Sequence, residues 1–276
     1  MRVFMIVVLT FFASLLFAKD NNVRVLTLDA QGITRLKATC GAGFLKVKGS
    51  PELQQIRVTA AIRPEGLDAR KLSKAVKLSL TRDGSTAVLV SKTKNDNFSL
   101  FDWIFGGDVQ SVEIDLTIEI PQKMDLKIID GSGSTEIGNV IGQADIIDGS
   151  GFLTVKNLQG ALEITDGSGS ILVQNINGDC TIRDGSGEMT LKQIEGNVDI
   201  TDGSGAIFAN QVEGAMDITD GSGEINLKHI GQTITIRDGS GDIRVDDVNG
   251  DLVIKSAGSG GVFTNDVKGR IIGLHK

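Results

Sequence analysis

Aspartate recurs in this chain at a spacing that could serve calcium binding. The tetrapeptide Asp-Gly-Ser-Gly occurs seven times, and each copy begins 18 residues after the one before: Asp130, Asp148, Asp166, Asp184, Asp202, Asp220 and Asp238. Carboxylate oxygens are preferred Ca²⁺ ligands, so an acidic ladder along one edge of a repeat protein could hold a row of ions. Alternatively, each carboxylate accepts N–H groups from the following Ser and Gly in an Asx-turn. We favour the Asx-turn and keep calcium as the alternative.

The second corner of each repeat bears on the calcium interpretation. Calcium-binding β-roll repeats carry Gly-Gly-x-Gly-x-Asp, with the aspartate after the glycines, whereas here the aspartate precedes them. Nine residues after each aspartate stands a mostly uncharged side chain: Asn139, Asn157, Asn175, Gln193, Gln211, His229 and Asp247. This corner lacks a second carboxylate for the ion. We therefore expect no cofactor, with Ca²⁺ as the one candidate.

A cluster of aromatic residues upstream of the repeats is the second candidate site. It comprises Phe98, Phe101, Trp103 and Phe105. Exposed aromatic side chains often anchor a protein partner, and they could also reach a membrane surface. The same segment could instead cover one end of the repeat array. The expected partner is an envelope protein or a surface glycan, and membrane contact is expected only through residues 98–105.

Composition argues against several function classes. The chain has 28 basic and 35 acidic residues and a net charge of −7, which gives no basic surface for nucleic acid. His229 and His275 are its only histidines, and no nucleophile, general base or phosphate-binding loop is recognisable before the repeats. The repeats also contain no long loops that could build a substrate cleft. We predict a protein that is not an enzyme.

The 18-residue spacing also predicts the elements that position these side chains. Each repeat divides into two nine-residue halves, and each half is a small polar corner followed by alternating apolar and polar residues, as in a short strand. The sequence therefore predicts an all-β, single-stranded parallel β-solenoid (β-helix), in which each 18-residue rung has two strands. Strand n should stack on strand n+2, about 4.8 Å away. One rung should bury Ile171, Val173, Ile176, Cys180 and Ile182.

The N-terminal residues predict export. Residues 1–18 run from Arg2 through an apolar stretch to the small residue Ala18, which is typical of a secretory signal peptide. We therefore expect a periplasmic, cell-surface or extracellular protein. Cys40 and Cys180 should remain free thiols, because several rungs would separate them and a disulfide needs Cα atoms within about 7 Å.

The remaining residues divide into two parts. Residues 19–129 are strand-rich but irregular and are predicted to form an N-terminal β cap with degenerate rungs, while residues 130–276 form the regular solenoid. Residues 40–48 match a half-repeat with cysteine in place of aspartate. Residues 83–91 could be another half-repeat or could begin with a hairpin turn at Asp-Gly. Residues 67–76 could form a short helix.

Two features carry a family resemblance. They are the alternating strand from Val112 to Ile120 that ends at Pro121, and the recurrent apolar-x-Asp-Gly-Ser-Gly-x-apolar unit, as in residues 164–171. With them the chain resembles a bacterial family of exported β-strand-repeat proteins of unknown function that carry the name "putative adhesin" and are related to the head GIN domain. The resemblance covers residues 23–274. It implies the solenoid architecture and an adhesin-like role, and it brings no catalytic motif.

These observations lead to one expected function and two alternatives. We expect an exported, non-enzymatic β-solenoid that acts as a binding or scaffold module of the bacterial envelope. The first alternative is a calcium-stabilised surface adhesin or matrix protein that uses the aspartate ladder. The second is a polysaccharide-active β-helix enzyme.

Overall fold

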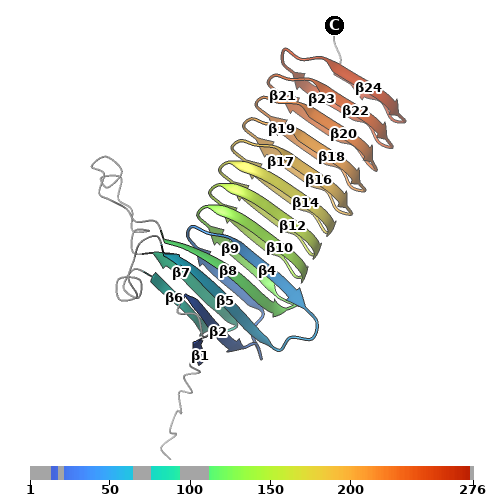
Figure 1. The fold of residues 1–276 in the computed structure, drawn as a ribbon. Helices are drawn as coiled ribbons and strands as arrows, with labels where there is room; N and C mark the ends of the chain where they lie inside the picture. Colours follow the sequence, from blue (N-terminus) through green and yellow to red (C-terminus); the bar gives the residue numbers. More distant parts are fainter. Residues whose placement is uncertain (1–13, 18–21, 65–75, 94–111, 274–276) are drawn as a thin grey trace, which may run out of the picture.

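Two long, facing β-sheets make up the protein. The computed structural model describes residues 14–17, 22–64, 76–93 and 112–273. These residues form 25 strands and no helix, with 13 strands in the first sheet and 12 in the second (Figure 1). Among them there is accordingly no helix that is long and apolar enough to cross a membrane. The all-β prediction is confirmed.

The regular part is a parallel solenoid in which the chain alternates between the two sheets. The first sheet contains β10 (Gly133–Ile141), β12 (Gly151–Gln159), β14 (Gly169–Asn177), β16 (Met189–Ile194), β18 (Ile207–Val212), β20 (Ile225–Ile230), β22 (Ile243–Val248) and β24 (Val262–Val267). The second contains β9 (Asp125–Asp130), β11 (Ala144–Asp148), β13 (Leu162–Asp166), β15 (Cys180–Asp184), β17 (Val198–Asp202), β19 (Met216–Asp220), β21 (Ile234–Asp238), β23 (Leu252–Ala257) and β25 (Ile271–Ile272). Each strand pairs in parallel with the strand two positions away in sequence, as predicted.

The register between rungs is 18 residues. Cys180, for example, pairs with Leu162 on one side and with Val198 on the other. The register shifts once, between β21 and β23, where Ile254 pairs with Ile236 and Ser256 with Arg237, so that Lys255 is the extra residue. The bulge lets a degraded copy of the corner, Ala-Gly-Ser-Gly at residues 257–260, follow the seven regular ones.

The core lies between the two sheets, where alternate side chains of every strand meet. Ile171, Val173, Ile176, Cys180 and Ile182 are at most 1% exposed, which confirms the predicted inward set of that rung. Cys40 and Cys180 are free and buried, also as predicted. Burial raises the pKa of both thiols, so neither is an activated nucleophile.

One early rung of the N-terminal part stacks directly on the solenoid. It consists of β3 (Arg35–Cys40) and β4 (Leu45–Ser50), which pair in parallel with β9 and β10. Residues 40–48 are thus a true half-repeat. On the other side of this rung lie β7 (Thr86–Thr93) against β3 and β8 (Val112–Pro121) against β4. The early rung is therefore inserted between strands that follow it in sequence.

Antiparallel strands close the N-terminal end of the stack (Figure 1). In the second sheet, β6 (Val76–Asp83) pairs with β7 in a hairpin that turns at Gly84, so the hairpin interpretation of residues 83–91 is correct. In the first sheet, β8 is followed by β5 (Gln55–Pro64), β2 (Val23–Asp29) and β1 (Ser14–Phe17). The predicted helix at 67–76 falls outside the described residues except for Val76, which begins β6.

Candidate functional site

The seven repeat aspartates point into the solenoid. We predicted a ladder along its edge, but each aspartate is the last residue of a second-sheet strand and has the same inward parity as the apolar residues before it. Their exposed fractions are only 2% to 6%. Neighbouring strands place them side by side, as in the pairing of Asp148 with Asp130 and with Asp166. We call these seven residues the aspartate column.

Hydrogen bonds hold one oxygen of most of these carboxylates. In four rungs the N–H group of the following serine donates to the aspartate Oδ1 at 3.0 to 3.3 Å: Ser186 to Asp184, Ser204 to Asp202, Ser222 to Asp220 and Ser240 to Asp238. This is the contact of an Asx-turn. The first member of the column differs, because Thr135 Oγ1 donates to Asp130 Oδ2 at 3.0 Å.

The column is electrostatically costly when it is ionised. In the four carboxylates that accept a serine N–H group, the other oxygen, Oδ2, is buried without a hydrogen-bond partner among the described residues: Asp184, Asp202, Asp220 and Asp238. Burial, together with repulsion from the neighbouring carboxylates Asp130 and Asp166, raises the pKa of Asp148 to about 7. Burial likewise raises the pKa of the other members, to about 6 for Asp130, Asp184, Asp202 and Asp220. Near pH 6 the column therefore keeps protons that exposed aspartates have lost, and Asp148 still keeps part of its proton at pH 7.

The calcium interpretation concerns the same aspartate column. Ca²⁺ takes six to eight oxygens. In the part of the chain that the structure describes, no group of three or more His, Cys, Asp or Glu side chains is arranged to hold a metal ion. Calcium binding by the aspartate column stays a prediction, and a chelator experiment described in the Discussion tests it.

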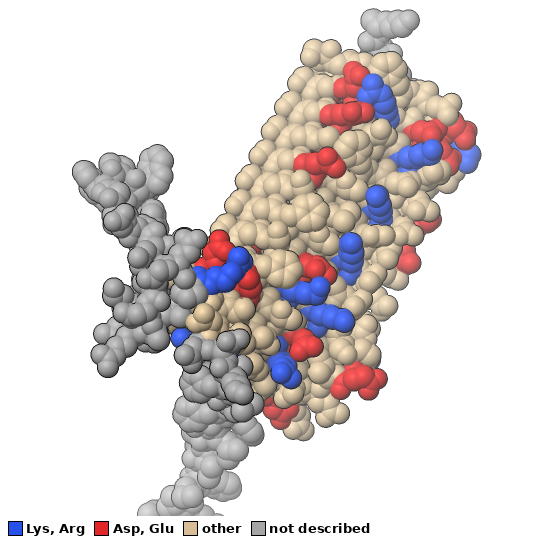
Figure 2. Space-filling view, in the orientation of Figure 1, with Lys and Arg blue, Asp and Glu red and all other residues tan. Residues whose placement is uncertain are grey.

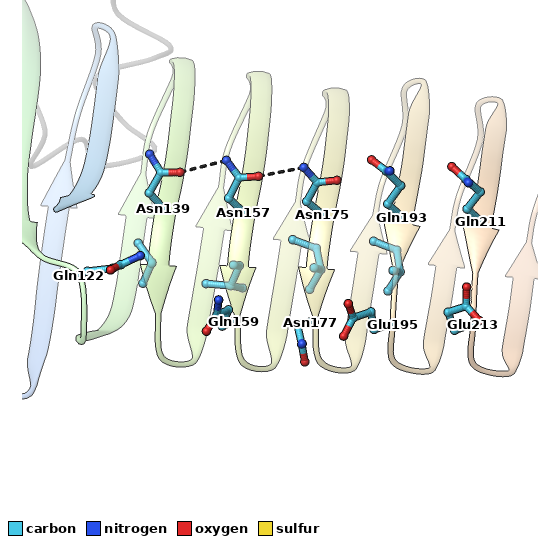
Figure 3. Close-up of a pocket in the computed structure, with 14 residues that line it drawn as sticks. Gln122, Asn139, Asn157, Gln159, Asn175, Asn177, Gln193, Glu195, Gln211 and Glu213 are labelled. Atoms are coloured by element: carbon cyan, nitrogen blue, oxygen red, sulfur yellow. Dashed lines mark hydrogen bonds between the residues drawn. The ribbon is translucent and has the colours of Figure 1, made fainter. Parts of the chain in front are cut away.

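A polar groove runs along the second corner of the rungs. It has a volume of about 510 Å³ and crosses the first sheet from β10 to β18. Figure 3 shows two rows of polar side chains along it. The first, which we call the amide row, consists of Asn139, Asn157, Asn175, Gln193 and Gln211. The second row consists of Gln159, Asn177, Glu195 and Glu213.

The amide row has an unusual backbone conformation. Its five residues all have φ between +55° and +62°, in the left-handed region. A non-glycine residue pays about 1–2 kcal/mol to enter this region. The local bend turns the following apolar residue inward, as at Leu158 and Ile176, which are each 1% exposed. The bend therefore places the amide side chains on the surface of the solenoid and the apolar residues that follow them in its core.

Hydrogen bonds link the first three amides of the row. Asn157 Nδ2 donates to Asn139 Oδ1, and Asn175 Nδ2 donates to Asn157 Oδ1, both at 2.9 Å (Figure 3). A primary amide has two N–H donors and two acceptor lone pairs. Asn157, in the middle, therefore keeps one donor and one acceptor for a ligand. The sequence prediction noted this corner only as uncharged and missed both its left-handed backbone and its role as a groove wall.

The groove is uncharged over most of its length. Its described lining residues include no Lys, Arg or His, and the only charged ones are Glu195 and Glu213 at one end. On the face that Figure 2 shows, basic and acidic side chains are interspersed. Exposed pairs such as Arg183 with Glu163, at 3.1 Å, contribute little to stability.

The aromatic cluster at Phe98, Phe101, Trp103 and Phe105 lies outside the described residues. Its proposed role in partner binding stays a prediction.

Comparisons with known proteins cover most of the chain. The family model described as Toastrack DUF4097 matches residues 68–265. Among solved structures, a "putative lipid binding protein" from Parabacteroides distasonis ATCC 8503 is 16% identical with a TM-score of 0.46, and a "putative adhesin" from Parabacteroides merdae ATCC 43184 is 16% identical with a TM-score of 0.43. A "putative adhesin" from Bacteroides fragilis NCTC 9343 is 14% identical with a TM-score of 0.41. Each match covers 92% of this chain and 97% of the other. No curated protein matches the chain.

Proposed function

Because the chain belongs to the Toastrack DUF4097 family, whose model covers residues 68–265, we propose that it is a rigid, non-enzymatic binding module exported to the bacterial envelope. The groove between the amide row and the second row is its binding site.

Export rests on the leader-like residues 1–18. Cleavage after Ala18 would remove β1 and leave β2 as the edge strand of the first sheet.

The observation that carries this proposal is a preformed polar groove on regular strands. Five successive rungs present their amide side chains from backbone positions that the parallel register fixes 18 residues apart. A site built on packed strands has little conformational entropy left to lose when a ligand binds. Such a groove is suited to holding an extended ligand along the solenoid.

The placement of the acidic residues favours binding over catalysis. Glycosidases use two carboxyl groups that flank the scissile bond. In the groove, Glu195 and Glu213 lie in the same row on neighbouring rungs, and the facing positions are Gln193 and Gln211 (Figure 3). At this end of the groove a ligand thus meets carboxylates on one side and amides on the other, without an acid and a base placed across from each other.

A groove-blocking variant tests this function. We expect immobilised protein to retain material from a solubilised envelope fraction, and Asn177→Trp to abolish retention because its bulky side chain fills the groove. Asn226→Trp is the matched control, since Asn226 lies on β20 beside Phe208 and outside the groove. Neither the wild type nor either variant should release reducing sugars. Equal retention by Asn177→Trp would move the site elsewhere, and reducing-sugar release that Glu195→Gln or Glu213→Gln abolishes would make the protein an enzyme.

A further inference from the structure

The amide row keeps side chains where glycine would fit the backbone better. Eight non-glycine residues of the described chain have φ between +46° and +62°: the five of the amide row, His229 and Asp247 at the same corner of the next two rungs, and Asp266. Asparagine often enters the left-handed region because its short side chain bonds locally, but glutamine has no such advantage. Gln193 and Gln211 nevertheless have φ of +59° and +62°. Because glutamine gains nothing locally from this strained conformation, its side chain is a candidate for a role in binding.

The contacts of the two glutamines support this reasoning. Gln193 receives one long hydrogen bond, from Gln174 Nε2 to Gln193 Oε1 at 3.5 Å. Both residues are exposed and line the groove. Their amide groups thus lie at the surface beside the groove, with donors and acceptors available to a ligand.

The chemistry of the groove selects an uncharged, hydroxyl-rich ligand. Each amide offers both a donor and an acceptor, which is also what each hydroxyl group of a sugar offers. The described lining contains no cationic side chain for a polyanion, and Glu195 and Glu213 repel one. Protein interfaces draw most of their binding energy from Trp, Tyr and Arg, and none of these lines the groove.

The spacing of the amides favours a polysaccharide over a peptide. Successive amides stand one strand apart, about 4.8 Å, whereas an extended peptide advances about 3.3 Å per residue. A peptide would therefore fall out of step with the row within a few rungs. A sugar unit in an extended β-1,4-linked chain is longer than an amino-acid residue and close to one strand spacing. Successive units are turned over, so equivalent hydroxyl groups meet every second amide, and other hydroxyl groups of the intervening unit meet the amide between.

We propose that the groove binds an uncharged, extended polysaccharide along the solenoid axis, with about one sugar unit per rung. This inference rests on the proposed function and specifies its ligand. Asn139, Asn157 and Asn175 form the hydrogen-bonded part of the row, and Gln193 and Gln211 continue it toward the acidic end of the groove.

The test replaces both glutamines by the residue that their backbone prefers. The variant Gln193→Gly/Gln211→Gly should fold with an unchanged or higher melting temperature, because glycine takes the left-handed conformation without strain. Calorimetric titration with cellohexaose and with chitohexaose should detect binding to the wild type. The double variant should bind about tenfold more weakly or worse, since two amide contacts are lost. Asp266→Gly is the matched control, because Asp266 has φ of +46° on β24 and lies outside the groove.

The possible outcomes are distinct. Equal affinity of the wild type and the double variant would overturn the inference, and so would a marked loss of thermal stability, which would give the glutamines a role in folding. Binding of polygalacturonate in preference to the neutral hexasaccharides would contradict the uncharged ligand. If only extended peptides bind, and Asn177→Trp abolishes that binding, the polysaccharide inference fails while the binding function stands.

Discussion

Replacing Gly187 with alanine should prevent the solenoid from folding. Gly187 is the second glycine of an Asp-Gly-Ser-Gly corner and has φ of +145°, a conformation that side chains disfavour. A Cβ atom there would lie 1.5 Å from the carbonyl oxygen of Gly169 and 2.6 Å from its carbonyl carbon, both in the rung below. Because the obstacle is backbone, only separation of the rungs could relieve the overlap. The expected cost is about 5 kcal/mol or more, comparable to the whole stability of many domains.

Circular dichroism and thermal melting measure this effect, and Gly138→Ala is the control. Gly138 lies on β10 of the first sheet, and a Cβ there would meet only the carbonyl oxygen of Lys156, at 3.4 Å. We expect Gly138→Ala to melt close to the wild type and Gly187→Ala to be expressed as unfolded or aggregated protein. A Gly187→Ala variant that melts like the wild type would show that the rungs are not stacked in this register.

The second large effect is a loss of stability as the pH rises. Burial raises the pKa of the column aspartates, to about 7 for Asp148 and about 6 for four others, above the ordinary value of 3.8. The folded protein therefore binds more protons than the unfolded chain between about pH 4 and pH 7. The stabilisation is fully present below pH 4 and is lost as the pH rises through 6 and 7. We expect the melting temperature to fall between pH 5 and pH 8, with a total change of several kcal/mol in the free energy of unfolding.

Asp148→Asn isolates the contribution of the column. Removing this carboxyl should raise the melting temperature at pH 8 and reduce its pH dependence, because the variant has no buried charge at that rung. Asp199→Asn is the matched control, since Asp199 is exposed on β17 and should leave the pH profile unchanged. A melting temperature that stays flat from pH 5 to pH 8 in the wild type would contradict the buried column.

A chelator distinguishes protons from calcium in the same assay. If protonation, and not a bound ion, is what reduces the repulsion between the buried carboxylates, EDTA at pH 8 should leave the melting temperature unchanged. A sharp fall on adding EDTA, reversed by excess Ca²⁺, would instead support the calcium-stabilised alternative.

The repeat spacing predicted most of the regular architecture because a solenoid rung is a local unit. Alternation at Ile171, Val173, Cys180 and Ile182 was enough to identify the inward face, and the 18-residue period determined which strands pair. The same alternation continues from Ile182 to Asp184, so the inward position of the aspartate was present in the pattern. It was missed because a charged residue beside two glycines was assigned to the corner.

Two other features could not be derived from local patterns. The insertion of β3 and β4 between later strands depends on pairing between residues far apart in sequence, such as Leu45 with Thr135 and with Leu116. The groove depends on a left-handed bend that asparagine suggests but glutamine does not. The sequence did contain one signal of the amide row, the constant interval of nine residues from aspartate to amide. Only the backbone angles show that this interval marks a left-handed bend at each of these rungs.

The dependence of affinity on ligand length tests the central claim most directly. Without aromatic stacking in the groove, each sugar unit should contribute weakly, so binding must accumulate over the five rungs of the amide row. Calorimetry with a series of cello-oligosaccharides should show affinity rising from the disaccharide to about the pentasaccharide, and little gain beyond it. Equal affinity for the disaccharide and the hexasaccharide would contradict a ligand that lies along the rungs.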